Sequence, residues 1–455
     1  MSVARGLAEF LVGFPAAELP AQTVDYAAML IASTFASAAM GRGIESAAIV
    51  RDLARADGGT PEASVWFERG ARLPAANAAQ ANALASDAAA SDDSDLRAIV
   101  HVGTPLTATT LALAERTGAP GSEVLAAIVL GYEAAGRVSE GITPGFRERG
   151  LHGCFGAIFG AAVAAGRLLH LDATAMTRTI ALAATSIGGL AAAANTSVAR
   201  EYHAGLATWL GIRAALAGQR GYAAEQRILE TRQGYFEAYG GVDGAAAGEA
   251  ALRDLGREWD IVTDMAVKLV PGGHPYHAFA EAAAKAARQG DFAADAVESI
   301  TVSRPGLTAL GGPLHPADLI DMAHSPAYFT AAGVADRDFS WVHATPEKIA
   351  DPAIHRLIDK VRVGRPPTEE IERYRQGATV TIRLTDGRSY TSTVFAPKGA
   401  GLLGIAWRDI DAKYRTLMPL SGLPAAQIEA SLAVIHDFGR QARVSRLIEL
   451  IELAA

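Results

Sequence analysis

Several short segments of this 455-residue chain place histidine, lysine or arginine beside glycine and apolar residues. In the first segment, the acidic run Ser91–Asp95 is followed closely by His101. A carboxylate at this distance in the chain could orient a histidine that acts as a general base. The alternative is a solvated acidic loop with a capping histidine, which would have the same spacing.

The second segment places His152 just before a glycine-rich helix, where backbone N–H groups point at an anion. Its glycines form neither a Walker loop nor a GxGxxG motif, so phosphate binding is weakly supported. Cys154 lies nearby, but positions i and i+2 of a helix do not face each other. A lone cysteine in an apolar helix is more often a core residue than a nucleophile.

A third segment, Arg200-Glu-Tyr-His203, joins two alanine-rich helices. Its arginine could hold a carboxylate through two parallel hydrogen bonds, or it could form an ordinary salt bridge at a helix end. In the fourth segment, Lys268 stands inside an apolar run before Pro271. Burial would lower the pKa of this lysine and suit it to act as a base or an anion clamp. Alternatively, its stem covers the core while its ammonium group reaches water.

The last segment, Asp321–Tyr328, could contribute a hydroxyl or an imidazole, or it is an ordinary polar loop. His274 and His277 could pair on a metal ion, but no third ligand is evident. The chain has no HExxH, CxxC or EF-hand pattern. We therefore predict no metal site.

The overall charge excludes some classes of partner. The chain carries 41 basic and 49 acidic residues, a net charge of −8, with no basic stripe. We therefore expect no nucleic-acid binding. An anionic substrate must then be attracted by local arginine, lysine and histidine side chains. The single cysteine excludes an internal disulfide framework and a cysteine-rich metal site.

The N-terminal segment lacks the apolar run of a secretory signal. The longest apolar stretches, 153–166 and 179–195, are shorter than the roughly 20 residues of a membrane span. Both stretches are rich in alanine and glycine, which favours buried core helices. We expect a cytoplasmic protein without a membrane segment.

The elements that must position these residues are mostly helices. Helix formers at helical spacing, separated by glycine and proline, predict seven helices before residue 270. They are expected at 22–40, 74–89, 105–116, 122–138, 156–169, 173–193 and 204–218. Asp172 is a predicted N-cap, and the spacing of Gly153, Gly156 and Gly160 predicts close helix packing.

The pattern changes after residue 271. Strands are predicted at 297–302 and 360–363, and a hairpin at 379–395 has a type I′ turn at Asp386-Gly387. Amphipathic helices follow at 425–438 and 441–453. The predicted fold class is mainly α: a large all-helical domain (1–270), a smaller α+β domain (271–400), and a helical tail (401–455) that packs back on the first domain. We expect the active site in the crevice between the two domains.

These segments resemble, in order, the motifs of the 2-methylcitrate dehydratase-like family, often called MmgE/PrpD. The family also includes cis-aconitate decarboxylase and iminodisuccinate epimerase. The resemblance covers most of the chain. Its matching motifs are His101-x-Gly, Gly150-x-His152-Gly, Arg200-x2-His203-Ala-Gly205, Lys268-x2-Pro271 leading to His277, and Ala323-His-Ser-x2-Tyr328. Arg200 stands where the family usually has lysine, so it can bind charge but cannot act as a base.

The resemblance implies that the α+β domain is a lid, that the chain forms a homodimer, and that it needs no metal or organic cofactor. It also implies a catalytic set and a substrate-binding set of residues. The expected catalytic residues are His101, His152, Lys268, Tyr328 and Asp93. The expected substrate-binding residues are Arg200, His203, Lys268, His274, His277 and Asp92, with Asp95 as a further candidate for the acidic partner.

The expected function is that of a lyase on a small di- or tricarboxylic acid, which removes a proton next to a carboxylate. Within the family we favour a dehydratase or hydratase, since loss of water is its commonest activity. Epimerisation and decarboxylation on the same scaffold remain open, as does a non-catalytic carboxylate-binding protein. A hydrolase that depends on Cys154 is a further alternative.

Overall fold

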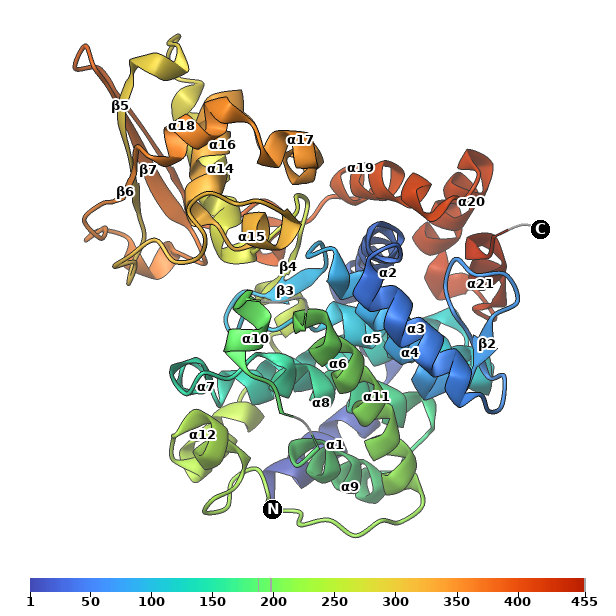
Figure 1. Cartoon of the computed structure of the whole chain (residues 1–455). Coiled ribbons are helices and arrows are strands. Elements are labelled where there is room, and N and C mark those ends of the chain that lie inside the picture. The colour runs from blue at the N-terminus through green and yellow to red at the C-terminus, as the bar shows by residue number, and fades with distance from the viewer. Residues whose placement is uncertain (187, 197–198, 454–455) are drawn as a thin grey trace. The chain divides into compact units, whose positions relative to one another are not determined.

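The structure is a computed structural model that describes residues 1–186, 188–196 and 199–453. It is 58% helix and 8% strand, which confirms the predicted mainly α fold class. The chain divides into two compact units. The helical unit comprises Met1–Val267 and Ile405–Ala455, and the sheet unit comprises Lys268–Gly404 (Figure 1).

Alanine-rich helices form the core of the helical unit. They are α2 (Ala21–Gly41), α4 (Ala75–Ala88), α5 (Gly103–Thr117), α6 (Gly121–Glu140), α8 (Cys154–Leu168), α9 (Ala173–Ala184) and α11 (Arg200–Gln219). Helix α11 packs against α4, α8 and α9, and α8 also packs against α6. The backbones approach closely where the helices carry glycine, since a Cβ at Gly160 would lie 3.2 Å from the carbonyl oxygen of Gly131.

Shorter helices surround this core: α1 (Val3–Gly13), α3 (Glu45–Asp57), α7 (Gly145–Glu148), α10 (Ala191–Thr196), α12 (Gly244–Leu252) and α13 (Asp260–Thr263). Asp172 caps α9 as predicted, because its side chain accepts the Ala175 N–H at 2.7 Å. The predicted helix at 173–193 is wrong in its second half. Helix α9 ends at Ala184, and Gly188 and Gly189, which are costly inside a helix, lie before α10. Residue 187 of that prediction lies outside the described residues.

Helix α2 is long and apolar enough to cross a membrane, by length and composition only. However, 83% of its apolar window is buried inside the structure. This is the environment of a core helix. Asp25 and several Thr and Ser residues interrupt the apolar run of this helix, so the sequence alone did not predict it as a candidate span.

The C-terminal tail contributes α19 (Trp407–Leu417), α20 (Ala425–His436) and α21 (Ser445–Ile451), coloured red in Figure 1. Helix α19 packs along α2. Its buried side is formed by Ile410, Lys413, Tyr414 and Leu417. The tail therefore places a lysine on the apolar face of a packed helix.

The helical unit also contains two strand pairs that the sequence analysis did not predict. One joins β1 (Ala63–Ser64) to β2 (Arg72–Leu73), and the other joins β3 (Asp93–Asp95) to β4 (Met265–Val267). All three residues of β3 are buried, although their side chains are polar. Pairing with the apolar strand β4 satisfies the backbone of this buried acidic run.

The sheet unit has a four-stranded sheet in the order β6-β5-β7-β8. Its strands are β5 (Val297–Ser303), β6 (Val361–Val363), β7 (Ala378–Leu384) and β8 (Ser389–Val394), of which only β5 and β6 are parallel. The helices α14 (His274–Ala287), α16 (Pro326–Asp336) and α18 (Pro352–Ile358) lie on one side of this sheet (Figure 1). Two smaller helices are α15 (Leu319–Ala323) and α17 (Pro346–Ile349).

The predicted hairpin is present as β7 and β8, but its turn type is wrong. Gly387 has a positive φ of 88°, whereas Asp386 does not appear among the residues with positive φ. A type I′ turn requires positive φ at both central residues. The Gly387 N–H donates to the Leu384 carbonyl, so the connection is a three-residue loop with glycine in the left-handed position.

A network of charged side chains around Arg97 lies next to β3 and β4. Arg97 bonds Asp264 with two of its nitrogens and lies 3.0 Å from Asp260, and it also pairs with Glu140. Asp95, at the end of β3, accepts the backbone N–H groups of Arg97 and Ala98 at 2.9 and 2.8 Å. The turn after β3 is therefore held by one carboxylate.

Replacing Asp95 by Asn tests whether this buried carboxyl keeps its proton. Burial and the neighbouring Asp264 raise the pKa of Asp95 from 3.8 to about 7. As the pH rises between these values, the unfolded chain loses the proton while the folded chain keeps it. The free energy of unfolding therefore falls with pH. Since one pKa unit corresponds to about 1.4 kcal/mol, this group should account for a loss on the order of 4 kcal/mol.

Urea unfolding of the wild type and of Asp95→Asn between about pH 4 and about pH 8 measures most of this contribution. The amide oxygen of the variant can still accept the two backbone N–H groups, but it does not ionise. We expect a flatter pH dependence in Asp95→Asn. Parallel curves for the two proteins would show that Asp95 ionises normally in the folded state.

Candidate active site

Three histidine rings form a row inside the helical unit. The ring centroids of His101 and His152 are 6.3 Å apart, and those of His152 and His203 are 5.0 Å apart. Two carboxyl groups and one guanidinium group complete what we call the histidine–carboxylate cluster. Its members are His101, His152, His203, Asp87, Asp92 and Arg200.

The cluster is assembled by the packing of α11 on α4 and α8. Asp87 lies in the last turn of α4, and Arg200 and His203 lie in the first turn of α11. His152 comes just before α8, and His101 comes just before α5. The helix ends therefore bring together residues that are more than a hundred positions apart in the chain, such as Asp87 and Arg200.

His101 has the geometry of an oriented base. Its Nδ1 lies 2.8 Å from the backbone carbonyl of Asp93 and 2.8 Å from the Asp92 carboxylate. A carbonyl oxygen only accepts, so Nδ1 carries the proton and the lone pair is on Nε2. The Asp92 carboxylate stabilises the positive charge that His101 would gain on taking a proton from a substrate.

The three carboxylates of the acidic run have different partners. Asp92 faces His101, as described above. Asp93 accepts the N–H of Gly103 at 2.9 Å and the hydroxyl of Tyr132 at 3.2 Å, which ties β3 to the start of α5 and to α6. Asp95 holds the turn after β3. Of the three, Asp92 therefore has the contact expected of the acidic partner of His101.

Arg200 and Asp87 form a buried ion pair. The Arg200 Nε donates to Asp87 at 3.0 Å, and its Nη2 bonds the Asp87 backbone carbonyl. Burial alone would lower the pKa of Arg200, but Asp87, Asp92 and Glu201 raise it above its usual range. Burial raises the pKa of Asp87 from 3.8 to about 6, against the effect of Arg200 and with that of Asp92. The guanidinium group is thus a permanent cation beside two carboxyl groups.

His152 and His203 share a hydrogen bond between their Nδ1 atoms, which are 3.1 Å apart. One ring must donate and the other must accept. Burial lowers the pKa of both histidines, and that of His152 is lowered further by Arg200 and by His101 or His203 whenever these rings are protonated. Both rings are therefore neutral near pH 7, and one proton lies between them.

Cys154 lies beside this pair, and its thiol is poorly suited to act as a nucleophile. Burial raises its pKa to about 12, so the reactive thiolate is scarce at neutral pH. This argues against the alternative of a Cys154-dependent hydrolase. Within the described residues, two groups have atoms close enough to ligate one metal ion: His152, Cys154 and His203, and Asp87, Asp92 and His101.

Four of the predicted site residues belong to the sheet unit. Lys268 is its first residue and is 1% exposed. His274 and His277 are buried at the start of α14, with ring centroids 4.8 Å apart, and His277 stacks on Phe329. Tyr328 is buried in the core of the sheet unit, where its hydroxyl donates to the His343 carbonyl at 2.9 Å.

Comparison with known protein families places these observations in context. The MmgE/PrpD N-terminal domain matches residues 5–248, and the MmgE/PrpD C-terminal domain matches residues 271–436. The chain belongs to the MmgE/PrpD family. The resemblance noted from the sequence motifs is thereby confirmed.

Two relatives of this MmgE/PrpD protein carry related names. A cis-aconitate decarboxylase-like protein, oryM, from Aspergillus oryzae is 27% identical over 307 residues, which cover 61% of each chain. The match thus spans less than two thirds of that relative. Cis-aconitate decarboxylase from Mus musculus is 24% identical over 434 residues, or 91% of this chain and 86% of the relative.

Two buried charged residues of this MmgE/PrpD chain were not among the predicted site residues. Asp87 is the partner of Arg200, and Lys413 on α19 is 2% exposed. The Lys413 ammonium group donates to the Ser33 hydroxyl at 2.8 Å and to the Ser91 carbonyl at 2.5 Å. The sequence does contain a signal for Lys413. This lysine follows Ile410 by three positions and directly precedes Tyr414, which puts it on the apolar side of an amphipathic helix.

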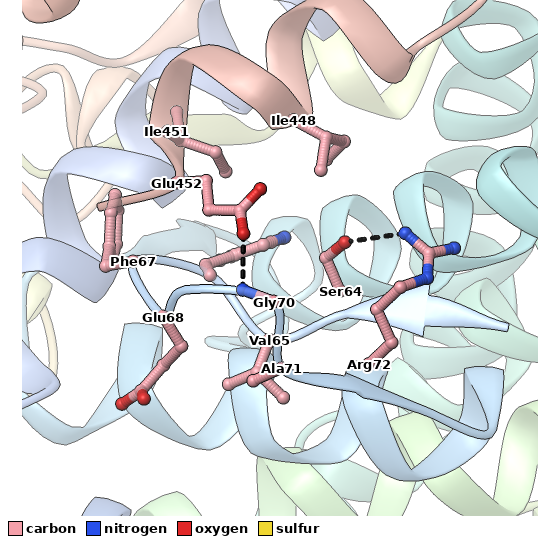
Figure 2. A pocket seen from close by; sticks show the side chains of 11 residues that line it. Ser64, Val65, Phe67, Glu68, Gly70, Ala71, Arg72, Ile448, Ile451 and Glu452 are labelled. Atoms are coloured by element: carbon pink, nitrogen blue, oxygen red, sulfur yellow. Dashed lines mark hydrogen bonds between the residues drawn. The ribbon is translucent and has the colours of Figure 1, made fainter. Parts of the chain in front are cut away.

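A small pocket formed by other residues of the helical unit has a different character (Figure 2). It lies between the loop 64–72 and α21, and its volume is about 40 Å³, little more than one water molecule. Glu452 bonds the Gly70 N–H there, and the Ser64 hydroxyl bonds Arg72. These polar groups already have partners, which argues against a reaction site in this pocket.

Replacing Lys413 by Met tests its contribution to the helical unit. Methionine has a similar length but cannot donate, so the Ser33 hydroxyl and the Ser91 carbonyl each lose a buried hydrogen bond. We expect the free energy of unfolding to fall by about 1–3 kcal/mol, measured by urea denaturation. The same substitution at Lys285, whose pair with Glu281 is partly exposed, is a matched control with an expected loss below about 1 kcal/mol. Equal effects at the two sites would contradict an anchoring role for Lys413.

Proposed function

We propose that this protein is a cofactor-independent lyase that acts on a small di- or tricarboxylic acid by removing a proton next to a carboxylate. The observation that carries the proposal is the arrangement of His101. Its Nδ1 donates to the Asp93 carbonyl at 2.8 Å, and the Asp92 carboxylate lies 2.8 Å from the same nitrogen. This arrangement leaves Nε2 as a base with a carboxylate behind it.

The chemistry has a specific difficulty that the proposed roles answer. A carbanion beside an ionised carboxylate has two negative charges on neighbouring atoms. Catalysis then needs cations on the carboxylates, a base at the carbon and an acid at the leaving group. In this proposal His101 is the base, and Arg200 binds a substrate carboxylate.

The charges of the cluster indicate that a second cation is required. Arg200 already faces the carboxyl groups of Asp87 and Asp92, and it is the permanent cation of the cluster. Alone it cannot neutralise a substrate with two or three carboxylates. We propose Lys268 for this role, since it directly follows Val267 in the chain, and Val267 pairs with Asp93 in the β3–β4 ladder.

The acid is best supplied by the hydrogen-bonded pair of His152 and His203. Both rings are neutral near pH 7, so the pair would first take up one proton from solvent. The ring that carries this proton can then donate it as the acid, while the hydrogen bond between the two Nδ1 atoms holds the rings together. The hydroxyl of Tyr328 is a weaker choice, because it is already donated to a carbonyl in the core of the sheet unit. The proton goes to the departing hydroxyl in a dehydration.

Dehydration and decarboxylation are each supported by a different observation. The pairing of His101 with Asp92 favours dehydration, since loss of water begins with abstraction of a proton by a base. The names of the two relatives favour decarboxylation of a tricarboxylic acid, in which the histidine pair would protonate the product carbanion. Dehydration is our first choice and decarboxylation our second.

A product analysis separates these reactions. The protein is incubated in D₂O with citrate-like, aconitate-like and aspartate-derived acids and followed by NMR and by CO₂ release. Dehydration forms an alkene without CO₂, decarboxylation releases CO₂, and epimerisation incorporates deuterium without loss of mass. Thermal stabilisation by a tricarboxylate without any turnover would instead indicate a binding protein and contradict the proposed activity.

Substitution of Asp92 by Asn tests the base. The amide cannot stabilise an imidazolium, so we expect kcat to fall by about 10²–10⁴-fold with little change in KM. Asp359→Asn is a matched control, because Asp359 pairs with His315 at 2.9 Å on an exposed part of the sheet unit. The control should retain full activity. Wild-type kcat in Asp92→Asn would remove the central support for the proposal.

Substitution of Lys268 by Met tests the second cation. Methionine fills the space of the buried side chain but carries no charge, so kcat/KM should fall by at least about a hundredfold. Circular dichroism and size-exclusion chromatography establish that the variant is folded. A folded variant with the kcat/KM of the wild type would exclude Lys268 from substrate binding.

A further inference from the structure

Three side chains that could bind a metal ion, one thiol and two imidazoles, lie close together in the helical unit. The ligand atoms of His152, Cys154 and His203 all lie within 4.8 Å of one another. Cys154 is the first residue of α8, His152 comes two residues earlier, and His203 lies in the first turn of α11. The proposed reaction uses the two histidines but has no role for the thiol.

The two imidazoles already have nearly the separation that a zinc ion requires. Zn–N bonds of about 2.0–2.1 Å in a tetrahedral site put two nitrogen ligands about 3.3 Å apart. The Nδ1 atoms of His152 and His203 are 3.1 Å apart. A metal ion between them would bind the lone pairs of both Nδ1 atoms, and the proton that they share would move to Nε2 of the ring that donates it.

A glycine leaves the space beside the thiol open. A Cβ at Gly189 would lie 2.6 Å from the Cys154 sulfur and 3.1 Å from Cε1 of His203. Any other residue would press a side chain against both potential ligands. The Gly189 carbonyl also accepts a hydrogen bond from the His152 backbone N–H at 3.2 Å. This bond holds the backbone of Gly189 next to His152.

The other group of potential ligands is less suited to a metal ion. Asp87, Asp92 and His101 also have atoms within 4.8 Å of one another. However, Asp87 is held by Arg200 in a buried ion pair. A divalent ion there would have to compete with a permanent cation for the same carboxylate. The set with sulfur and two imidazoles is therefore the better site.

We propose that His152, His203 and Cys154 form a binding site for Zn²⁺ or another thiophilic divalent ion, and that the bound ion inhibits the enzyme. Two nitrogens and one sulfur leave the fourth tetrahedral position for water or a substrate carboxylate. On binding, the sulfur–metal bond replaces the S–H bond, and the thiol proton leaves to solvent. The inhibition rests on the proposed function, because the ion takes the lone pairs of the His152–His203 pair. The binding of the ion does not depend on the proposed function.

Cobalt(II) titration of the metal-stripped full-length protein tests binding without reference to activity. Co²⁺ in a tetrahedral site with a thiolate ligand gives intense visible absorption and a sulfur-to-cobalt charge-transfer band. We expect one Co²⁺ per chain with both features, and displacement of the cobalt by Zn²⁺. Absence of the charge-transfer band, or its appearance only at several ions per chain, would overturn the proposed site.

Cys154→Ser is the matched variant, because it removes the sulfur at nearly constant volume and leaves the proposed catalytic groups intact. We expect wild-type turnover, no charge-transfer band, and Zn²⁺ affinity reduced by about tenfold or more. Unchanged Zn²⁺ affinity in this variant would overturn the proposal. Gly189→Ala is a second variant with all ligands present, and it should weaken Co²⁺ binding because its methyl group meets the sulfur.

Inhibition is then measured on the active wild-type protein. Turnover should fall with the same Zn²⁺ dependence as cobalt displacement and return on addition of EDTA, whereas Cys154→Ser should resist the same Zn²⁺ concentration. Binding of Zn²⁺ to the wild type without loss of turnover would overturn the inhibitory part. If none of the acids is turned over, the proposed function fails, while the cobalt spectra still decide whether the site exists.

Discussion

A carboxyl group taken out of water must be paired with a cation, bonded to N–H groups, or keep its proton. The segment from the end of α4 through β3 buries four such groups within nine residues, and each finds a different partner. The pairs are Asp87 with Arg200, Asp92 with His101, Asp93 with Gly103 and Tyr132, and Asp95 with the turn at Ala98. Because these partners lie on different elements, satisfying the carboxyl groups also fixes where α11, α5 and α6 meet the acidic segment.

The same contacts prepare the site for chemistry. The ion pair of Arg200 with Asp87 holds the first turn of α11 against α4, and this turn carries His203 to His152. Arg200 therefore has a structural partner that a bound anion would have to share. A site built in this way is preorganised, because its charged groups are already oriented before a substrate arrives.

The C-terminal tail also contacts the acidic segment. Lys413 of α19 reaches the Ser91 carbonyl, directly before Asp92, and the Ser37 hydroxyl donates to the same carbonyl. A buried ammonium group is costly unless its N–H groups are bonded. Its bonds to Ser33 and Ser91 therefore tie the tail, α2 and the acidic segment together.

The sequence alone determined the family and the mainly α fold class, because ordered motifs and helical periodicity are local properties of the chain. It also determined that a histidine, an arginine and an acidic run were candidates for chemistry. The tertiary structure decided which groups meet. Asp92 rather than Asp93 or Asp95 lies at the Nδ1 of His101, and Asp87 and Lys413, which no motif marked, became buried partners. These pairings join positions far apart in the sequence, and they depend on the packing of helices whose relative positions no local pattern specifies.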